Sequence, residues 1–208
     1  MSSDASCDTP WPPAGCPALA WPPLPDDDAR MAWYRAVISA RAELWAGHRS
    51  APTLAPVDAA AVAMRETTLG CALPPLLRRY HLELGALSLA ERLCGVDTEP
   101  RIEPLIDAYP AIRERALDED DCARLAELVV FSDYLGNGNL FCFHRLSGEV
   151  YYFDHDEGAM LTRFFPSVAD YLDALMILSL GEVHEDTAQA EALLVQRHGQ
   201  ALVRKWMY

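Results

Sequence analysis

The sequence predicts an α+β fold with a mostly antiparallel central sheet flanked by helices. Residues 127 to 165 contain apolar segments separated by Gly136-Asn137-Gly138-Asn139 and by Ser147-Gly148. Gly and Asn supply the positive φ angles of tight hairpin turns, so this region is expected to be an antiparallel meander. Helical patterns precede and follow the meander and do not alternate with strands, which favours α+β over a parallel α/β sheet.

The chain begins with a leader rich in proline and tryptophan, residues 1–28. Repeated proline removes backbone donors and fixes φ, so neither helix nor sheet is expected there. The two Trp-Pro-Pro repeats, which contain Trp11 and Trp21, suit an apolar groove on this chain or on a partner, or else a poorly ordered tail. We expect the leader to be partly disordered or packed on the domain, and residues 29–208 to form a single domain.

Helix boundaries can be read from capping residues. The acidic run Asp26 to Asp28 is expected to cap the first helix, and proline at the start with glycine past the end marks others. Residues 86–126 are less regular: 87–96 suit a short strand or loop, and the acidic run 118–121 suits a loop or a helix start. The expected helices are about 29–46, 57–69, 73–85, 166–181 ended by Gly181, and 186–197 with 201–208 as a possible extension past Gly199.

The chain has 208 residues, of which 51% are hydrophobic, a composition typical of a globular protein. No segment approaches the roughly 18 consecutive apolar residues of a membrane span, and the N-terminus does not resemble a secretory signal. The six cysteines are scattered without a Cys-x-x-Cys pair, which indicates reduced thiols and no structural zinc. The expected location is therefore the cytoplasm, with no membrane association.

The charge is strongly acidic, with a formal net value of −14. Residues 97–127 hold ten acids and four arginines, a net of −6, and residues 149–191 hold ten acids and one arginine, a net of −9. A field of this sign repels phosphate backbones and speeds encounter with basic partners, so direct nucleic-acid binding is disfavoured. The alternative is that the acidity serves only solubility.

Three segments, in this order, carry a resemblance to one known family. They are Glu66-x-x-Leu69-Gly70-x-x-Leu73-Pro74 continuing to Leu84-Gly85, then Phe131-Ser132-Asp133-Tyr134-Leu135-Gly136-Asn137, and last Ser147-Gly148-Glu149-Val150-Tyr151-Tyr152-Phe153-Asp154-His155-Asp156 before an aromatic strand and a helix. Over about residues 57–178 the chain resembles the SUKH superfamily, which includes fungal cell-wall assembly regulators and many bacterial immunity proteins.

The resemblance implies a central antiparallel sheet flanked by helices, and a protein that acts by binding. Bacterial members of this superfamily typically neutralise a polymorphic toxin, often a nuclease or deaminase, by covering its active site. The leader, the helix at 29–46 and the helices after Gly181 depart from the minimal pattern.

Asp154-His155-Asp156 is the motif most suggestive of metal or acid/base chemistry. If it continued a strand, Asp154 and Asp156 would share one face and His155 would lie on the other. Further ligands at metal spacing are lacking, so a polar strand end or a partner contact is the preferred interpretation. Gly136 to Asn139 match no phosphate-binding fingerprint and are interpreted as a turn in which Asn137 or Asn139 is left-handed.

The resulting hypothesis is a protein that binds without catalysis, cofactor or metal. Its partner would be a basic toxin domain, contacted through Asp133, Asp154, Asp156 and Glu157 at the strand ends. One rival is a regulatory or scaffolding adaptor that works through its leader, and a more distant one is an enzyme with an unrecognised site. The sequence assigns no oligomeric state.

Overall fold

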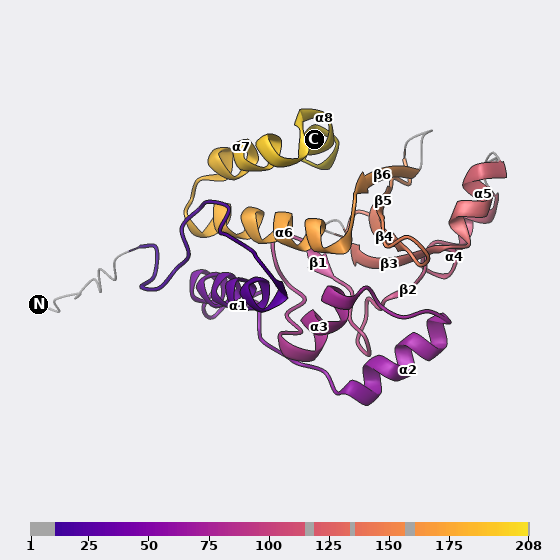
Figure 1. Cartoon of the computed structure of the whole chain (residues 1–208), viewed down its shortest axis with the longest axis horizontal. Helices are drawn as coiled ribbons and strands as arrows, with labels where there is room; N and C mark the ends of the chain where they lie inside the picture. The colour runs from indigo at the N-terminus through magenta and orange to yellow at the C-terminus, as the bar shows by residue number, and fades with distance from the viewer. Residues whose placement is uncertain (1–10, 115–118, 134–135, 157–160, 208) are drawn as a thin grey trace, which may run out of the picture.

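The computed structural model of the chain describes residues 11–114, 119–133, 136–156 and 161–207 (Figure 1). The predicted fold class is confirmed, because helices flank an open antiparallel sheet. The helices in the described residues are α1 Asp27–Leu44, α2 Ala59–Leu69, α3 Pro75–Glu83, α4 Leu105–Ala108, the 3-10 helix η1 Pro110–Glu114, α5 Glu119–Leu125, α6 Val168–Val183, α7 Thr187–His198 and α8 Gln200–Met207.

The sheet has six strands within the described residues. They are β1 Arg92–Leu93, β2 Glu103–Pro104, β3 Leu128–Asp133, β4 Leu140–His144, β5 Val150–Phe153 and β6 Leu161–Phe165. The order is β1-β3-β4-β5-β6, with β2 also paired to β3, and each of these pairings is antiparallel. The expected meander is therefore the main part of the sheet.

The hairpin turns take their positive φ angles from glycine and not from asparagine. Gly136, Gly138 and Gly148 have φ values of 74°, 94° and 74°, and among the described residues Glu185 is the only non-glycine with positive φ. The expectation of a left-handed Asn137 or Asn139 was therefore wrong. Asn137 instead accepts a hydrogen bond at Oδ1 from the Asn139 backbone N–H, at 2.9 Å, which stabilises the turn through its side chain.

Helix boundaries follow the expected capping chemistry. Asp26 accepts a hydrogen bond from the Ala29 N–H at 2.8 Å at the start of α1, and Gly70 ends α2 in the left-handed conformation. The expected end of α6 at Gly181 was wrong, since α6 continues to Val183. A Cβ at position 181 would lie 2.6 Å from the Cβ of Ala190, so this glycine allows α7 to pack closely against α6. The tail forms the separate helix α8, because the chain turns at Gly199 with φ of 87°.

Helix α6 lies at the centre of the molecule. In Figure 1 it passes between α1 on one side and the α7–α8 pair on the other, and its N-terminal end meets the sheet. The buried Tyr171 ring of α6 lies 4.8 Å from that of Phe141 and 5.0 Å from that of Phe131, measured between centroids. Trp206 of α8 packs against the same aromatic cluster, 5.4 Å from Phe165. The core thus joins the sheet to the C-terminal helices.

Residues 11–25 of the leader run along α6 and α7. The Trp11 indole N–H donates to the Val183 carbonyl at 2.7 Å, and the Trp21 indole N–H donates to the Leu193 carbonyl at 3.1 Å. The Arg197 guanidinium lies over the Trp21 ring, 4.2 Å from its centroid. The described part of the leader therefore packs on its own chain, while the division into residues 1–28 and 29–208 stays a prediction.

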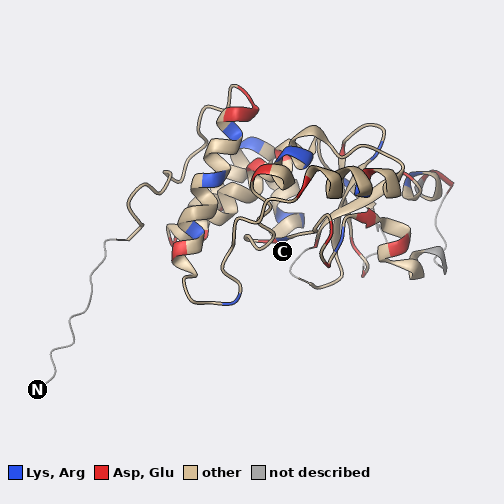
Figure 2. Cartoon of the chain, turned by 90° about the horizontal axis from the view of Figure 1, so that it is seen from below, with Lys and Arg blue, Asp and Glu red and all other residues tan. Residues whose placement is uncertain are grey.

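Acidic residues lie on both the helical and the sheet-bearing parts of the molecule, as Figure 2 shows. Several act locally as caps or in ion pairs; Glu127, for example, is bonded to Arg145. No helix in the part of the chain that the structure describes is long and apolar enough to cross a membrane.

Gly85 and Gly70 offer a matched pair of substitutions to alanine. Both are left-handed, with φ of 61° and 67°, but only Gly85 is crowded: a Cβ there would lie 2.0 Å from the carbonyl oxygen of Ala55. The Ala55 segment is fixed by its own N–H, which donates to the Leu84 carbonyl at 2.8 Å. We expect G70A to lower the free energy of unfolding by about 1 kcal/mol through backbone strain, and G85A by a further 1–2 kcal/mol or so through overpacking. Urea denaturation of both variants measures the difference, and equal losses would contradict the crowding argument.

Candidate functional site

The ends of β3 and β5 lie at the same edge of the sheet. Asp133 is opposite Leu140 in the register, and Leu140 is opposite Phe153, so Asp133 and the residues after Phe153 are neighbours across one strand. The structure therefore brings Asp133 near the Asp154–Asp156 segment, as the strand-end hypothesis requires. Glu157 lies outside the described residues.

The carboxylates at this edge differ in how exposed they are and in which backbone N–H groups they bind. Asp133 is half-buried and accepts a hydrogen bond from the Gly136 N–H at 3.0 Å. Asp154 is only 9% exposed and accepts one from the Asp156 N–H at 3.1 Å, so it also closes a turn. The Asp156 side chain is 77% exposed. Of the described candidates, Asp156 is the one best presented to a partner.

The expected face alternation of Asp154, His155 and Asp156 was wrong. Strand β5 ends at Phe153, and the chain then bends, so His155 and Asp156 come together: Nε2 of His155 lies 3.1 Å from Oδ1 of Asp156. The other ring nitrogen, Nδ1, lies 2.8 Å from Oδ1 of Asn139, which also accepts the His155 backbone N–H at 3.1 Å. Asn139, in the turn before β4, thus holds the segment after β5 in place.

No group of three or more His, Cys, Asp or Glu side chains placed to hold a metal ion occurs among the described residues. His155 and the two neighbouring aspartates fall short of such a group.

The residues that carried the family resemblance have structural roles. Oε1 of Glu66 accepts a hydrogen bond from the Leu73 N–H at 3.0 Å, which fixes the turn between α2 and α3. Ser132 is fully buried at the end of β3, where its hydroxyl lies 2.6 Å from Oη of Tyr171. These residues of the family resemblance therefore hold α2 to the start of α3 and β3 to α6.

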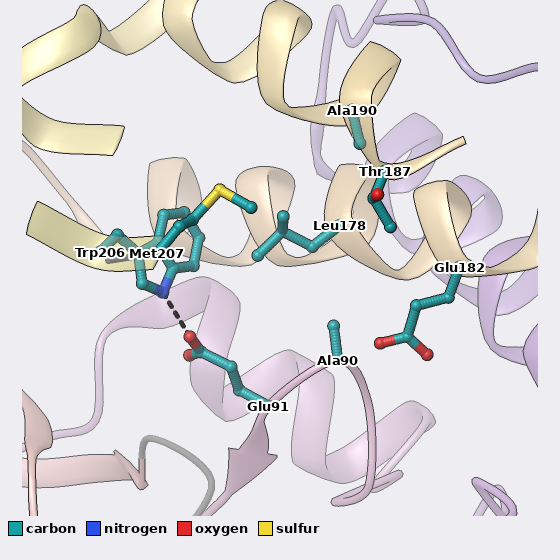
Figure 3. Close-up of a pocket in the computed structure, with 8 residues that line it drawn as sticks. All are labelled: Ala90, Glu91, Leu178, Glu182, Thr187, Ala190, Trp206 and Met207. Carbon is teal, nitrogen blue, oxygen red and sulfur yellow. Dashed lines mark hydrogen bonds between the residues drawn. The ribbon is translucent and has the colours of Figure 1, made fainter. Parts of the chain in front are cut away.

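Glu91 is a buried carboxylate between the sheet and α8. One oxygen accepts a hydrogen bond from the Trp206 indole N–H (Figure 3). The other oxygen lies 2.6 Å from Oη of Tyr171. Burial raises the pKa of Glu91 to about 7, although both hydrogen bonds act in the opposite direction. It lines a cavity of about 180 Å³, mostly apolar, together with Leu178, Glu182 and Trp206.

Counting protons independently favours a neutral Glu91. Three oxygen contacts follow one another: Glu91 to Tyr171 at 2.6 Å, Tyr171 to Ser132 at 2.6 Å, and Ser132 to the Arg92 carbonyl at 3.0 Å. Each contact needs one hydrogen, and the two hydroxyls supply two. A protonated Glu91 supplies the third, whereas an ionised one leaves a contact unsatisfied.

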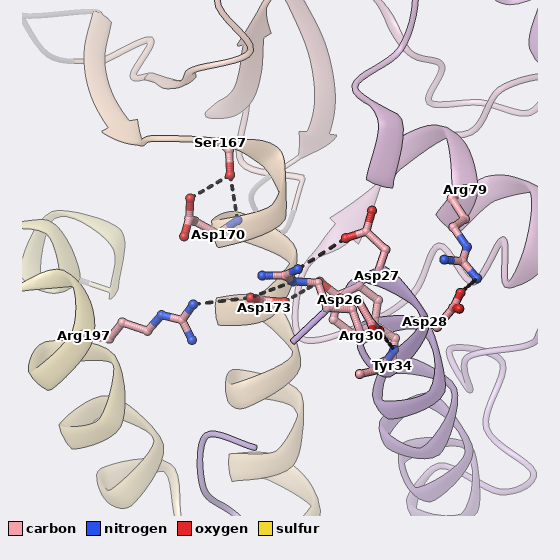
Figure 4. Close-up of polar contacts among 11 residues, drawn as sticks. Asp26, Asp27, Asp28, Arg30, Tyr34, Arg79, Ser167, Asp170, Asp173 and Arg197 are labelled. Carbon is pink, nitrogen blue, oxygen red and sulfur yellow. Dashed lines mark hydrogen bonds and ion pairs between the residues drawn. The ribbon is translucent and has the colours of Figure 1, made fainter. Parts of the chain in front are cut away.

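Asp173 is another buried carboxylate, and it joins three helices (Figure 4). Tyr34 of α1 donates to its Oδ1 at 2.5 Å, and Arg30 and Arg197 approach Oδ2 at 3.4 and 3.5 Å. Burial raises the pKa of Asp173, while Tyr34 and the two arginines oppose that rise. It stabilises the packing of α1 and α7 on α6.

The fold and the site together define a class of protein: an α+β domain whose polar residues mainly cap turns and join helices, with an exposed carboxylate at one sheet edge. The model of the SMI1 / KNR4 family (SUKH-1) matches residues 56–174, which is more than half of the chain, so the protein belongs to this family. The resemblance to the SUKH superfamily is thereby confirmed. No significant match is found among curated proteins or among solved structures.

Proposed function

We propose that this protein is a non-catalytic, cofactor-free binding protein of the immunity type, which acts in the cytoplasm by covering a basic surface of a cognate toxin domain. The observation that carries the proposal is the exposed Asp156 carboxylate at the edge where β3 and β5 end, in a family member with a formal charge of −14. Electrostatic complementarity of this kind speeds association and suppresses wrong partners.

Rigidity of the edge supports the same proposal. Asp154 accepts the Asp156 N–H and Asn139 accepts the His155 N–H, so the backbone that presents Asp156 is held in place by hydrogen bonds. Preorganisation lowers the entropy cost of association. The adaptor alternative has less support, because the indole N–H groups of Trp11 and Trp21 donate to carbonyls of the same chain.

Charge reversal at Asp156 tests the proposed surface. The probe is the protein encoded by the neighbouring gene, provided that it ends in a basic toxin domain, and the measurement is the association rate at low and at high salt. We expect D156K to slow association about tenfold at low salt and to weaken its salt dependence, because the reversed charge repels the basic surface.

The matched control is E43K, which reverses one exposed charge at the end of α1, away from the sheet edge. Co-expression of the same pair should also restore growth with the wild-type chain. Equal association rates for D156K and E43K would contradict the proposed surface, and failure of the wild type to bind or to restore growth would contradict the toxin partner.

A further inference from the structure

The cavity of about 180 Å³ lies between α6, α7, α8 and the segment that carries Ala90 and Glu91. Of its described lining residues, only these two lie within the family match at residues 56–174. The other walls come from the part of α6 beyond the match and from the two C-terminal helices. The cavity is therefore built mainly by a part of the chain that the family match does not cover.

The cavity is mostly apolar and has room for a small molecule. Its apolar walls are formed by Ala90, Leu178, Ala190, Trp206 and Met207. Ala90, Leu178 and Met207 are partly exposed, so a molecule in the cavity can touch their side chains. A protein cavity of about 150 Å³ with walls of this kind stays dry and holds benzene. An occupant with one aromatic ring therefore fits.

The carboxylate of Glu182 is within reach of such an occupant. The Glu182 side chain is 31% exposed, and in Figure 3 its carboxylate points toward Ala90. One carboxylate oxygen accepts a hydrogen bond from Arg41 at 2.6 Å, which holds the group in place. The other oxygen has no hydrogen-bond partner in the described part of the chain. An O–H or N–H group in the cavity can therefore donate to this second oxygen.

The cavity offers little net charge to a ligand. Arg41 balances the charge of Glu182, and burial favours the neutral form of Glu91. The two oxygens of Glu91 are already bonded to Trp206 and Tyr171. A cation would lose its hydration there without gaining an unpaired counter-charge, so a neutral ligand is favoured.

We propose that this cavity binds a small neutral molecule that has one aromatic ring and one O–H or N–H donor, such as a phenol. The ring lies against the side chains of Leu178 and Met207, where it buries apolar surface. The donor binds the second oxygen of Glu182, which fixes the orientation of the ring. The site depends neither on a toxin partner nor on Asp156.

The test is a titration of the full chain, labelled at its methionine methyl groups, with phenol and separately with toluene, which has the same size but no donor. The Met207 methyl signal, assigned from its absence in M207L, should shift with phenol and saturate with a Kd on the order of 1 mM, a value typical of so small a ligand. Toluene should bind about tenfold more weakly, because it has no hydrogen bond to give to a charged group. Equal or tighter binding of toluene would overturn the role of Glu182.

A90L fills the cavity, since the Ala90 side chain points into it (Figure 3), so the Kd for phenol should rise at least tenfold. A61L is the matched control, because Ala61 of α2 is likewise a partly buried alanine packed on the core but does not line the cavity. Shifts of the wild-type Met207 signal that do not saturate would overturn the proposal, as would equal affinities of A90L and A61L for phenol. The comparison of phenol with toluene uses the wild-type chain, so it decides the matter even where A90L disturbs the fold.

Discussion

Replacement of Glu91 by glutamine should make the protein more stable at alkaline pH, by about 3 kcal/mol at pH 8.5, with the gain shrinking to less than about 1 kcal/mol at pH 5. Glutamine has the shape of a protonated glutamic acid. Its carbonyl can accept the Trp206 N–H, and its amide can donate to Tyr171, so the hydrogen-bonded chain to Ser132 keeps its third proton.

That E91Q gains stability as the pH rises follows from the direction in which the pKa of Glu91 is shifted. The folded chain holds the pKa of Glu91 at about 7, above its ordinary value of 4.5. Between these values the folded state binds a proton that the unfolded state has lost. The stabilising contribution of Glu91 is therefore complete below pH 4.5 and is lost as the pH rises through 7, whereas a glutamine cannot ionise.

The measurement is the difference in the free energy of unfolding between E91Q and the wild type across this pH range. The two proteins have to be compared with each other at each pH, because buried His81 lowers the stability of both as the pH falls. Burial lowers the pKa of His81 to about 4. E43Q removes the same formal charge from an exposed position and controls for net charge. Parallel stability curves for E91Q and the wild type would show that Glu91 does not hold a proton in the folded state.

Replacement of Asp173 by alanine should cost about 3–5 kcal/mol of unfolding free energy, the usual loss when one partner of a buried ion pair is removed. Arg30 and Arg197 are partly exposed and can turn to water, but Tyr34 is fully buried. The Tyr34 hydroxyl would then lack an acceptor, and of the polar contacts between α1 and α6 the Arg41–Glu182 ion pair would remain.

A double-mutant cycle with Y34F separates these contributions. Once the Tyr34 hydroxyl is absent, D173A should cost about 1.5–3 kcal/mol less, which is the energy of a hydrogen bond to a charged group. D170A on the same helix is the matched control, because the Asp170 carboxylate accepts the Ser167 hydroxyl at the start of α6, at 2.7 Å, a contact within one helix end. Its expected loss is about 1 kcal/mol, and a loss for D173A no larger than this would contradict the proposed role of Asp173.

Much of the fold was predictable because glycine, proline and capping residues act over short distances. Gly70, Asp26 and the meander turns have the roles that their local sequence indicates. Gly181 was misinterpreted because its role depends on Ala190 of the next helix, a packing contact that composition alone does not reveal.

The candidate site was predictable only in outline. The sequence placed acids at the strand ends, but hydrogen bonds decide which are used in turns: Asp154 is buried and Asp156 is exposed. Glu91 and Asp173 were missed. Asp173 is the single charged residue within the apolar segment Leu172–Leu175, a pattern that signals a buried carboxylate, whereas Glu91 is followed directly by Arg92 and gives no such signal.

The position of α1 in the sequence means that it cannot pack fully until the end of the chain has been synthesised. The strands of the meander pair with neighbours along the chain, so they can form as soon as they are synthesised. Helix α1 emerges from the ribosome earlier, yet Tyr34 meets Asp173 across 139 positions. At ordinary translation rates its apolar side, including Met31, Val37 and Ile38, waits for α6 for on the order of ten seconds, a period in which this surface is open to non-native contacts.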